Sequence, residues 1–199
     1  MTKQEIRKEI KALCSQNVDL LAAKSTEICK KILSSPQYKD ATTLFAYMAL
    51  PDEVDLTPVI LDALQNGKNV ALPKIISQTD SIIKFFYLDK SKKLTEQTAT
   101  GTYNILEPDE SLPATPAPAQ KTLILVPGRA FTKEGDRLGR GKGYYDRFLS
   151  EKIVGSSLTM TSFPNFMLAG VCFDFQIKKS LPVDDRDIKM DLVFSILQE

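Results

Sequence analysis

The sequence predicts an α/β fold: a mostly parallel central sheet with helices on both faces, arranged as a three-layer sandwich. Short apolar segments rich in β-forming residues alternate along the chain with longer segments whose apolar residues recur at helical spacing. Residues 122–126 (TLILV) are apolar after the first position, which is typical of a strand covered on both faces. A length of 199 residues with 43% apolar residues suits one domain over residues 1–199.

Four helices are predicted along the chain. Residues 2–14 and 18–34 carry apolar side chains at helical spacing between charges, and Pro36 is expected to end the second helix. Residues 57–65 have a proline in the first turn and a glycine after the end, and residues 144–150 begin a further helix.

Strands are predicted from short segments rich in apolar and β-forming residues, which lie at residues 43–48, 69–72, 82–88, 122–126, 167–173 and 192–196. Residues 107–120 hold four of the eleven prolines. We expect an ordered surface connection there rather than a linker between domains, because neither flank looks autonomous.

Composition excludes several classes of function. The chain has no histidine, which removes Ser-His-Asp, Cys-His and His-metal chemistry. A net charge of +1 argues against a general binder of nucleic acids or anionic membranes. The three cysteines are widely spaced and form no CxxC pair, so we expect reduced, buried thiols. A charged N-terminus and the lack of an 18-residue apolar run predict a cytoplasmic protein.

The segment between Gly128 and Gly143 is the most informative one. It holds five of the nine glycines, follows the apolar segment 122–126 and precedes a helical pattern. Residues 128–148 carry a net charge of +3, whereas the rest of the chain carries −2. A glycine-rich loop before a helix predicts a site for a small polyanion such as a phosphate group. The spacing matches neither the Walker loop nor the dinucleotide pattern, and a flexible loop with solvated charges is the alternative interpretation.

Residues 137–146 (RLGRGKGYYD) closely resemble the signature of the 5-formyltetrahydrofolate cyclo-ligase family. The resemblance spans nearly the whole chain, through Lys3-x-x-x-Arg7, FAYM at 45–48, PDEVD at 51–55, VPGRAF at 126–131 and LPVDDRDIKMD at 181–191. Two positions depart from the family pattern: Arg129 stands where an apolar residue is usual, and Arg186 stands where many members carry histidine.

The resemblance implies an ATP-dependent ligase that converts 5-formyltetrahydrofolate to 5,10-methenyltetrahydrofolate and releases ADP and phosphate. The formyl oxygen would be phosphorylated, and N10 would then attack the formyl carbon. Such chemistry mainly needs positioning and charge neutralisation, which suits a chain without histidine. The implied ligands are ATP, Mg²⁺ and 5-formyltetrahydrofolate with or without a polyglutamate tail, and we expect a monomer with no nucleic-acid or membrane partner.

The resemblance also implies roles for particular residues. Lys142 and Arg140 are the expected catalytic residues. The expected ATP contacts are Lys3, Arg7, Arg137, Leu138, Gly139, Arg140, Gly141, Lys142, Gly143, Tyr144 and Tyr145. The expected substrate contacts are Ala46, Met48, Glu53, Tyr144 and Tyr145, and the expected Mg²⁺ ligands are Asp146 and Asp187.

Simpler interpretations of these residues remain open. Lys3 and Arg7 lie four residues apart, as in many solvated helix faces, and Ala46 and Met48 suit core packing equally well. Asp184, Asp185 and Asp191 are further candidates for the metal. Two other functions are alternatives. One is an enzyme for a phosphate-bearing ligand on a related α/β scaffold, such as a sugar-phosphate isomerase or a CoA transferase, and the other is a nucleotide- or RNA-binding module.

Overall fold

The computed structural model describes residues 1–114, 121–151, 166–184 and 187–196. Its central feature is a six-stranded sheet in the order β10-β9-β6-β1-β2-β3. The strands are β1 (Thr43–Phe45), β2 (Asn69–Ser77), β3 (Ile82–Tyr87), β6 (Thr122–Pro127), β9 (Phe166–Val171) and β10 (Leu192–Phe194). All neighbours pair in parallel except β2 and β3, which are antiparallel. The predicted α/β fold with a mostly parallel sheet is confirmed.

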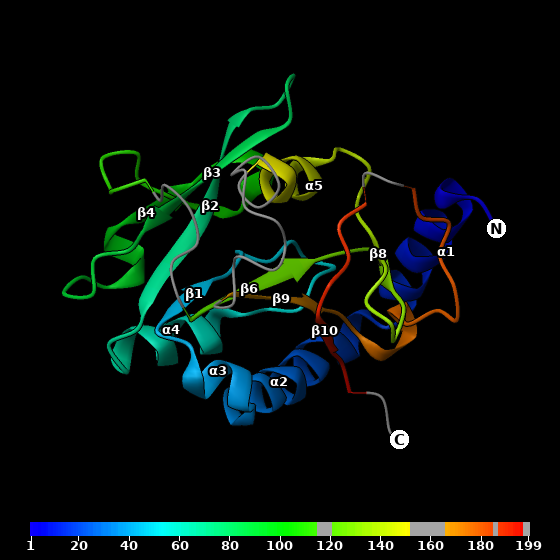
Figure 1. Cartoon of the computed structure of the whole chain (residues 1–199), viewed down its shortest axis with the longest axis horizontal. Helices are drawn as coiled ribbons and strands as arrows, with labels where there is room; N and C mark the ends of the chain where they lie inside the picture. The colour runs from blue at the N-terminus through cyan, green and yellow to red at the C-terminus, as the bar shows by residue number, and fades with distance from the viewer. Residues whose placement is uncertain (115–120, 152–165, 185–186, 197–199) are drawn as a thin grey trace.

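Helices cover both faces of this sheet (Figure 1). The helices α2 (Val18–Ser34), α3 (Pro36–Asp40) and α4 (Thr57–Gln65) pack on one face, and α5 (Tyr144–Leu149) packs beside β3 on the other. The side chains alternate accordingly: Leu44 of β1 belongs to the core under α2 and α4, and its neighbour Phe45 belongs to the core under α5.

β6 lies in the middle of the sheet and is buried as its composition predicts. Residues 122–126 are all inaccessible to solvent, and β6 pairs with β1 on one side and β9 on the other. Leu123 and Leu125 face the core under α2, whereas Ile124 and Val126 face the core under α5. A run of apolar residues is stable here because both of its faces leave water.

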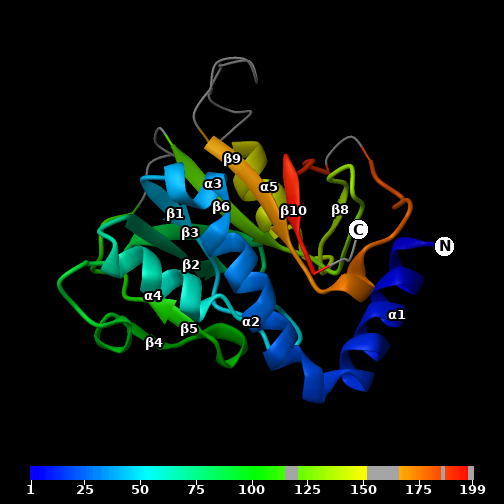
Figure 2. The ribbon, with the colours of Figure 1, turned by 90° about the horizontal axis from the view of Figure 1, so that it is seen from below.

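The first helix lies at the side of the sheet rather than on a face (Figure 2). α1 (Lys3–Gln16) begins with a capping box in which Thr2 and Glu5 exchange hydrogen bonds. Its apolar side packs on the hairpin of β7 (Ala130–Phe131) and β8 (Arg137–Leu138), a contact that brings the N-terminus of the chain to the glycine-rich segment.

A second small sheet flanks β2. It consists of β4 (Thr98–Thr100) and β5 (Leu106–Pro108), which pair in antiparallel fashion. Three short 3₁₀ helices complete the described elements, at Leu94–Glu96, Thr102–Asn104 and Asp174–Gln176. The proline-rich segment 107–120 therefore begins in a strand, and its residues 115–120 lie outside the described part.

The structure corrects some predicted boundaries. α2 ends at Ser34, just before Pro36, as predicted, but helical structure resumes at once, because Ser35 caps α3 and proline suits its first turn. The strand predicted over residues 43–48 ends at Phe45, and the one predicted over 69–72 continues to Ser77 as it pairs with β3. The remaining predicted helices and strands occur within a few residues of the expected limits.

The structure also bears on the cysteines and on the apolar character of the helices. Cys14, Cys29 and Cys172 are buried free thiols, as predicted. Burial raises the pKa of Cys29 to about 11, which keeps this thiol protonated at neutral pH. Within the part of the chain that the structure describes, no helix combines the length and apolar character needed to span a bilayer.

Candidate functional site

The candidate site lies where the order of the strands reverses. From β1 the chain moves to β2 on one side, and it later returns to β6 on the other side of β1 before continuing to β9 and β10. In open α/β sheets, ligands bind at the carboxyl ends of the strands on either side of such a reversal. Here Tyr47, Met48 and Glu53 follow the end of β1, and Arg129 follows the end of β6.

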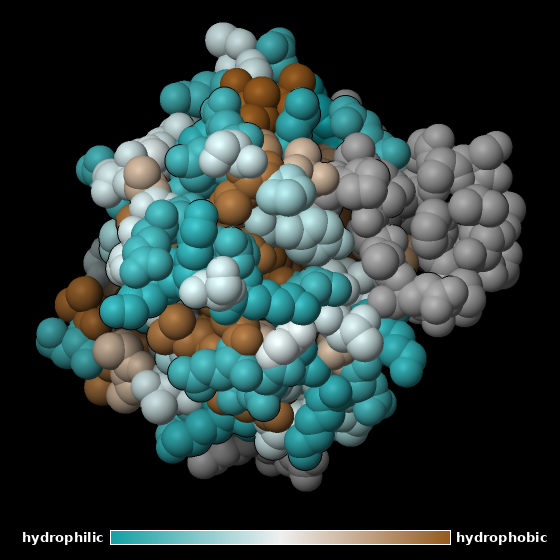
Figure 3. Space-filling model, turned by 90° about the vertical axis from the view of Figure 1, so that its left-hand side faces the viewer, coloured by the Kyte–Doolittle hydropathy of each residue, from teal (hydrophilic) through white to brown (hydrophobic). Residues whose placement is uncertain are grey.

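A cavity of about 430 Å³ occupies this position. Its lining is mostly apolar and aromatic, with charged groups at its ends, and consists of Tyr47, Met48, Leu50, Glu53, Pro73, Ile75, Ile83, Tyr103, Ile105, Glu107, Pro127, Arg129, Arg140, Lys142, Gly143, Tyr144 and Tyr145. Figure 3 views the molecule from the side on which β4 lies, where hydrophobic residues show between hydrophilic ones across the middle of the face. The cavity suits a ligand with a flat apolar body and polar ends.

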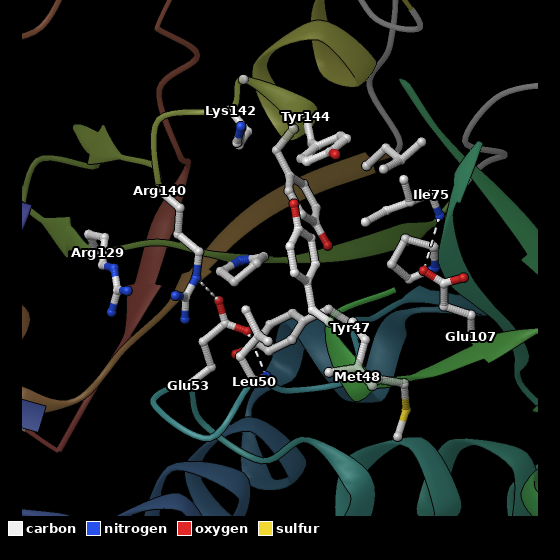
Figure 4. Close-up of a pocket in the computed structure, with 17 residues that line it drawn as sticks. Tyr47, Met48, Leu50, Glu53, Ile75, Glu107, Arg129, Arg140, Lys142 and Tyr144 are labelled. Carbon is white, nitrogen blue, oxygen red and sulfur yellow. Dashed lines mark hydrogen bonds and ion pairs between the residues drawn. The ribbon is translucent and has the colours of Figure 1, made fainter. Parts of the chain in front are cut away.

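Four charged side chains form a network at one end of the cavity, and Figure 4 shows three of them, Glu53, Arg129 and Arg140. Arg140 donates through Nε to Glu53 at 2.7 Å and through Nη2 to Asp52. Arg129 donates to the other oxygen of Asp52. Glu53 also accepts the Leu50 N–H at 3.0 Å, so each of its oxygens has a partner. We call Asp52, Glu53, Arg129 and Arg140 the charged network.

Two members of the charged network have shifted pKa values. Burial alone would raise the pKa of Asp52, but the hydrogen bonds from Arg140 and Arg129 outweigh burial and lower the pKa of this carboxyl. Burial likewise opposes the charge on Arg140, yet the neighbouring Glu53 and Asp52 raise its pKa. Asp52 and Arg140 therefore keep their charges at neutral pH.

Tyrosines form the wall between the ends of the cavity. The hydroxyls of Tyr47 and Tyr145 are buried, and neither has a hydrogen-bond partner among the described residues. Burial and the nearby Glu53 raise the pKa of both phenols. Burial and the neighbouring Tyr103 also raise the pKa of Tyr144, to about 12. Buried polar atoms rarely lack partners, so these hydroxyls favour a polar ligand in the cavity.

The glycine-rich loop lies between α1 and the cavity. Gly141 and Gly143 adopt left-handed backbone angles, with φ of 100° and 73°. Arg7 of α1 donates through Nε to the Gly139 carbonyl at 2.9 Å and lies against Gly141. Lys142, on the same loop, is exposed and lines the cavity.

Arg137 and Leu138 point elsewhere. Arg137 is only 4% exposed, donates to the Pro127 carbonyl and forms an ion pair with Asp146. Leu138 packs against α1. Neither side chain lines the cavity, because the β7–β8 hairpin turns them toward the interior. If Arg137 and Leu138 contact ATP, as the family resemblance implies, they would do so through backbone atoms rather than through their side chains.

The two expected metal ligands lie in different ion pairs. Asp187 accepts from Lys3 at 2.7 Å, and Asp184 accepts from the same ammonium at 2.9 Å. Asp146 is paired with Arg137. The described residues hold no cluster of three or more acidic or cysteine side chains suited to a metal ion. Asp185 and Arg186 lie outside the described residues.

Comparisons with known proteins match both the sequence and the fold. A family model described as the 5-formyltetrahydrofolate cyclo-ligase family matches residues 1–195. The chain belongs to this family. A probable 5-formyltetrahydrofolate cyclo-ligase from Schizosaccharomyces pombe is 31% identical over 194 residues, covering 93% of this chain and 92% of the relative. The 5-formyltetrahydrofolate cyclo-ligase of Mus musculus is 28% identical and covers 96% and 90%.

Solved structures agree with this assignment to the cyclo-ligase family. The solution structure of a 5,10-methenyltetrahydrofolate synthetase from Aquifex aeolicus superimposes with a TM-score of 0.70 at 28% identity, over 98% of this chain and 90% of that one. A synthetase structure from Mycoplasma pneumoniae has the same fold, with a TM-score of 0.67 at 23% identity. The predicted family and the mostly parallel α/β architecture are therefore both confirmed.

The structure brings seven of the residues expected from the family resemblance into the cavity lining. They come from two distant stretches of the chain and are Met48, Glu53, Arg140, Lys142, Gly143, Tyr144 and Tyr145. Ala46, by contrast, is fully buried in the core under α2. The strand predicted over residues 43–48 would place Ala46 and Met48 on the same face. β1 ends at Phe45, however, so strand alternation does not extend to these residues, and Tyr47 lines the cavity in place of Ala46.

Several lining residues were not expected from the sequence. The sequence could have indicated Arg129, because it is a charged residue close after a buried strand and one of the two departures from the resembled family pattern. It could not have indicated Tyr103 and Glu107, which reach the cavity from the short helix and the strand next to β2. No periodicity or motif marks that segment as part of the site.

Proposed function

We propose that this protein catalyses the ATP-dependent closure of 5-formyltetrahydrofolate to 5,10-methenyltetrahydrofolate, with release of ADP and phosphate. Its membership in the cyclo-ligase family supports the reaction class. The observation that carries the proposal is the direct contact between Arg140, expected to bind ATP phosphates, and Glu53, expected to bind the folate. With these roles, the sites for the two substrates would adjoin in one cavity.

The shape and lining of the cavity support a reduced pterin as the second ligand. A pterin is a flat bicycle with a polar edge, and it would lie along the wall that Tyr47, Tyr144 and Tyr145 form. The phenol hydroxyls of Tyr47 and Tyr145, which lack partners among the described residues, would then meet polar atoms of the ring or of the formyl group.

The chemical step is a phosphoryl transfer followed by a ring closure. The oxygen of the N5-formyl group attacks the γ-phosphorus of ATP, and ADP leaves. N10 then attacks the formyl carbon, loses its proton, and the carbon–oxygen bond breaks to release inorganic phosphate. The remaining carbon bridges N5 and N10 as a cationic methenyl group. No protein nucleophile is needed, which suits a chain without histidine.

Lys142 and Arg140 would supply the positive charge for this transfer. Lys142 is exposed at the mouth of the cavity, and a flexible ammonium there can follow the phosphoryl group from ATP to the formyl oxygen. Arg140 is held by Glu53 and Asp52, so phosphate oxygens would compete with these carboxylates for its guanidinium. Arg7 and Lys3 lie on the α1 face that meets the loop and would contact the nucleotide from that side.

Magnesium fits the oxygen donors of this site in chemical type. Asp146 and Asp187 offer carboxylates, and Mg²⁺ usually combines one or two of these with phosphate oxygens and waters. Each carboxylate now holds a cationic side chain, Arg137 or Lys3. When bound, the ion would neutralise charge on the phosphates, and these carboxylates would be its protein ligands.

The decisive experiment follows product formation by the absorbance of the methenyl group. Purified protein is mixed with 5-formyltetrahydrofolate and Mg²⁺, with and without ATP, while ADP release is measured in parallel. We expect methenyl product and ADP in equal amounts. Methenyl product should form only when ATP is present, and ADP should form only when 5-formyltetrahydrofolate is present. An isomerase or a CoA transferase on a related scaffold would form neither product, and that outcome would reject the proposal.

A further inference from the structure

A buried carboxylate lies at the end of the cavity opposite the charged network. Glu107 of β5 is only 4% exposed and lines the cavity beside Ile75, whereas Arg129, Arg140 and Lys142 lie together on the other side (Figure 4). The reaction as described uses no acidic group at this end. A buried acidic side chain facing an apolar cavity is unusual enough to need a reason.

The protein itself satisfies this carboxylate weakly. Its Oε1 accepts the Ile75 N–H at 3.4 Å, near the outer limit of a hydrogen bond. Its Oε2 is 3.8 Å from the Lys74 ammonium, which is equally far from the exposed Glu110. A carboxylate can accept about four hydrogen bonds. Lys74 therefore supplies the compensating charge, and most of the acceptor capacity of Glu107 remains for a ligand.

The backbone beside Glu107 is arranged to make room for the carboxylate. A Cβ at Gly101 would overlap the Cδ and Oε2 atoms of Glu107, so any other residue at position 101 would displace the carboxylate. Gly101 precedes the short helix Thr102–Asn104, and its N–H bonds to the Ile105 carbonyl, which keeps the glycine next to β5. The position of Glu107 is thus determined by its surroundings.

We propose that Glu107 binds the amino-pyrimidinone edge of the pterin and so determines the orientation of the folate. This inference rests on the proposed function. The edge presents two adjacent donors, the N3–H and the 2-amino group, and a carboxylate accepts such a pair with two parallel hydrogen bonds. Glu53, the carboxylate expected to contact the substrate, already pairs both of its oxygens with Arg140 and the Leu50 N–H.

This orientation agrees with the rest of the reaction. With the pyrimidinone edge at Glu107, the opposite side of the bicycle, which carries the N5-formyl group, points toward Arg140 and Lys142, where the phosphates would lie. The reverse orientation would place the anionic glutamate tail against a buried carboxylate, which is unfavourable. Glu107 therefore both attracts the correct end of the substrate and repels the other end.

The test compares 5-formyltetrahydrofolate with its 2-desamino analogue, which lacks one of the two donors. Both ligands are titrated calorimetrically into the wild-type protein and into Glu107→Gln, and KM values for folate and ATP are measured. Losing a hydrogen bond to a charged group typically costs about tenfold in affinity. We expect the wild-type protein to bind the analogue about tenfold more weakly and Glu107→Gln to bind both ligands equally. The KM for ATP should stay within about twofold.

Two further variants separate binding from folding. Gly101→Ala keeps the charge of Glu107 but displaces its carboxylate. Like Glu107→Gln, it should lower the affinity for 5-formyltetrahydrofolate and abolish the difference in affinity between this ligand and its analogue. Glu110→Gln is the control: the side chain of Glu110 is 69% exposed and is the other carboxylate near Lys74. This variant should change neither the affinity for folate nor the discrimination against the analogue. If Glu107→Gln keeps the wild-type discrimination against the analogue, the inference is wrong. If wild-type protein binds 5-formyltetrahydrofolate with this selectivity but forms no methenyl product, the proposed function fails and the inference stands.

Discussion

The contact between Glu53 and Arg140 should be a measurable source of stability as well as part of the site. The side chain of Glu53 is 8% exposed and that of Arg140 is 29% exposed, and the Nε–Oε1 distance is 2.7 Å. At an effective dielectric constant of about 20, the attraction between unit charges at this distance is on the order of 6 kcal/mol. Desolvation offsets most of it, and hydrogen bonds to charged groups contribute about 1.5–3 kcal/mol net.

We therefore expect a coupling free energy of about 2 kcal/mol between these two residues. The assay is a double-mutant cycle with Glu53→Gln, Arg140→Gln and the double variant, each unfolded in urea. The chain has no tryptophan, so far-UV circular dichroism is the suitable probe. Arg140→Gln should be the more damaging single change, because among the described residues it leaves the buried Glu53 with the Leu50 N–H as its one partner.

A matched control uses an ion pair that lies in solvent. Glu27 and Lys30 are 2.7 Å apart on α2, but their side chains are 57% and 67% exposed. Exposed pairs of this kind couple by less than about 0.5 kcal/mol. If the Glu53–Arg140 coupling is as small as that of the control, burial does not strengthen this contact and the reasoning is refuted.

Three other predictions concern charged side chains of the site. Lys142→Ala should lower kcat by about 100-fold or more with an unchanged thermal unfolding temperature, since this lysine is exposed, and near-normal turnover would remove it from the reaction. Asp146→Asn should raise the Mg²⁺ concentration needed for half-maximal rate; an identical magnesium titration would exclude it as a ligand. Asp52 has a lowered pKa, so its contribution to stability is present above the ordinary value of 3.8 and is lost as the pH falls through the lower folded value. The urea midpoints of wild type and Asp52→Asn should therefore differ most at neutral pH and converge in acid, and a constant difference would contradict the assignment.

Local patterns along the chain were sufficient for most of the fold. The helix at α1 follows from the spacing of its apolar residues, and β6 follows from an uninterrupted apolar run, because each depends on side chains within a few residues of one another. The β7–β8 hairpin was missed, since it has two residues in each strand and a glycine-rich composition that also suits a loop. Hairpins this short carry no periodic signal.

The sequence by itself determined the class of fold and the family, because those depend on composition, periodicity and a contiguous motif. The same motif predicts that the glycine-rich loop binds phosphates. Only the tertiary structure decided which side chains share the cavity. Glu53 and Arg140 are 87 positions apart and meet because β1 and β6 are neighbours in the sheet. Glu107 reaches the opposite end from a separate small sheet. Contacts between segments so distant depend on strand order and chain reversal, which no local pattern in the sequence encodes.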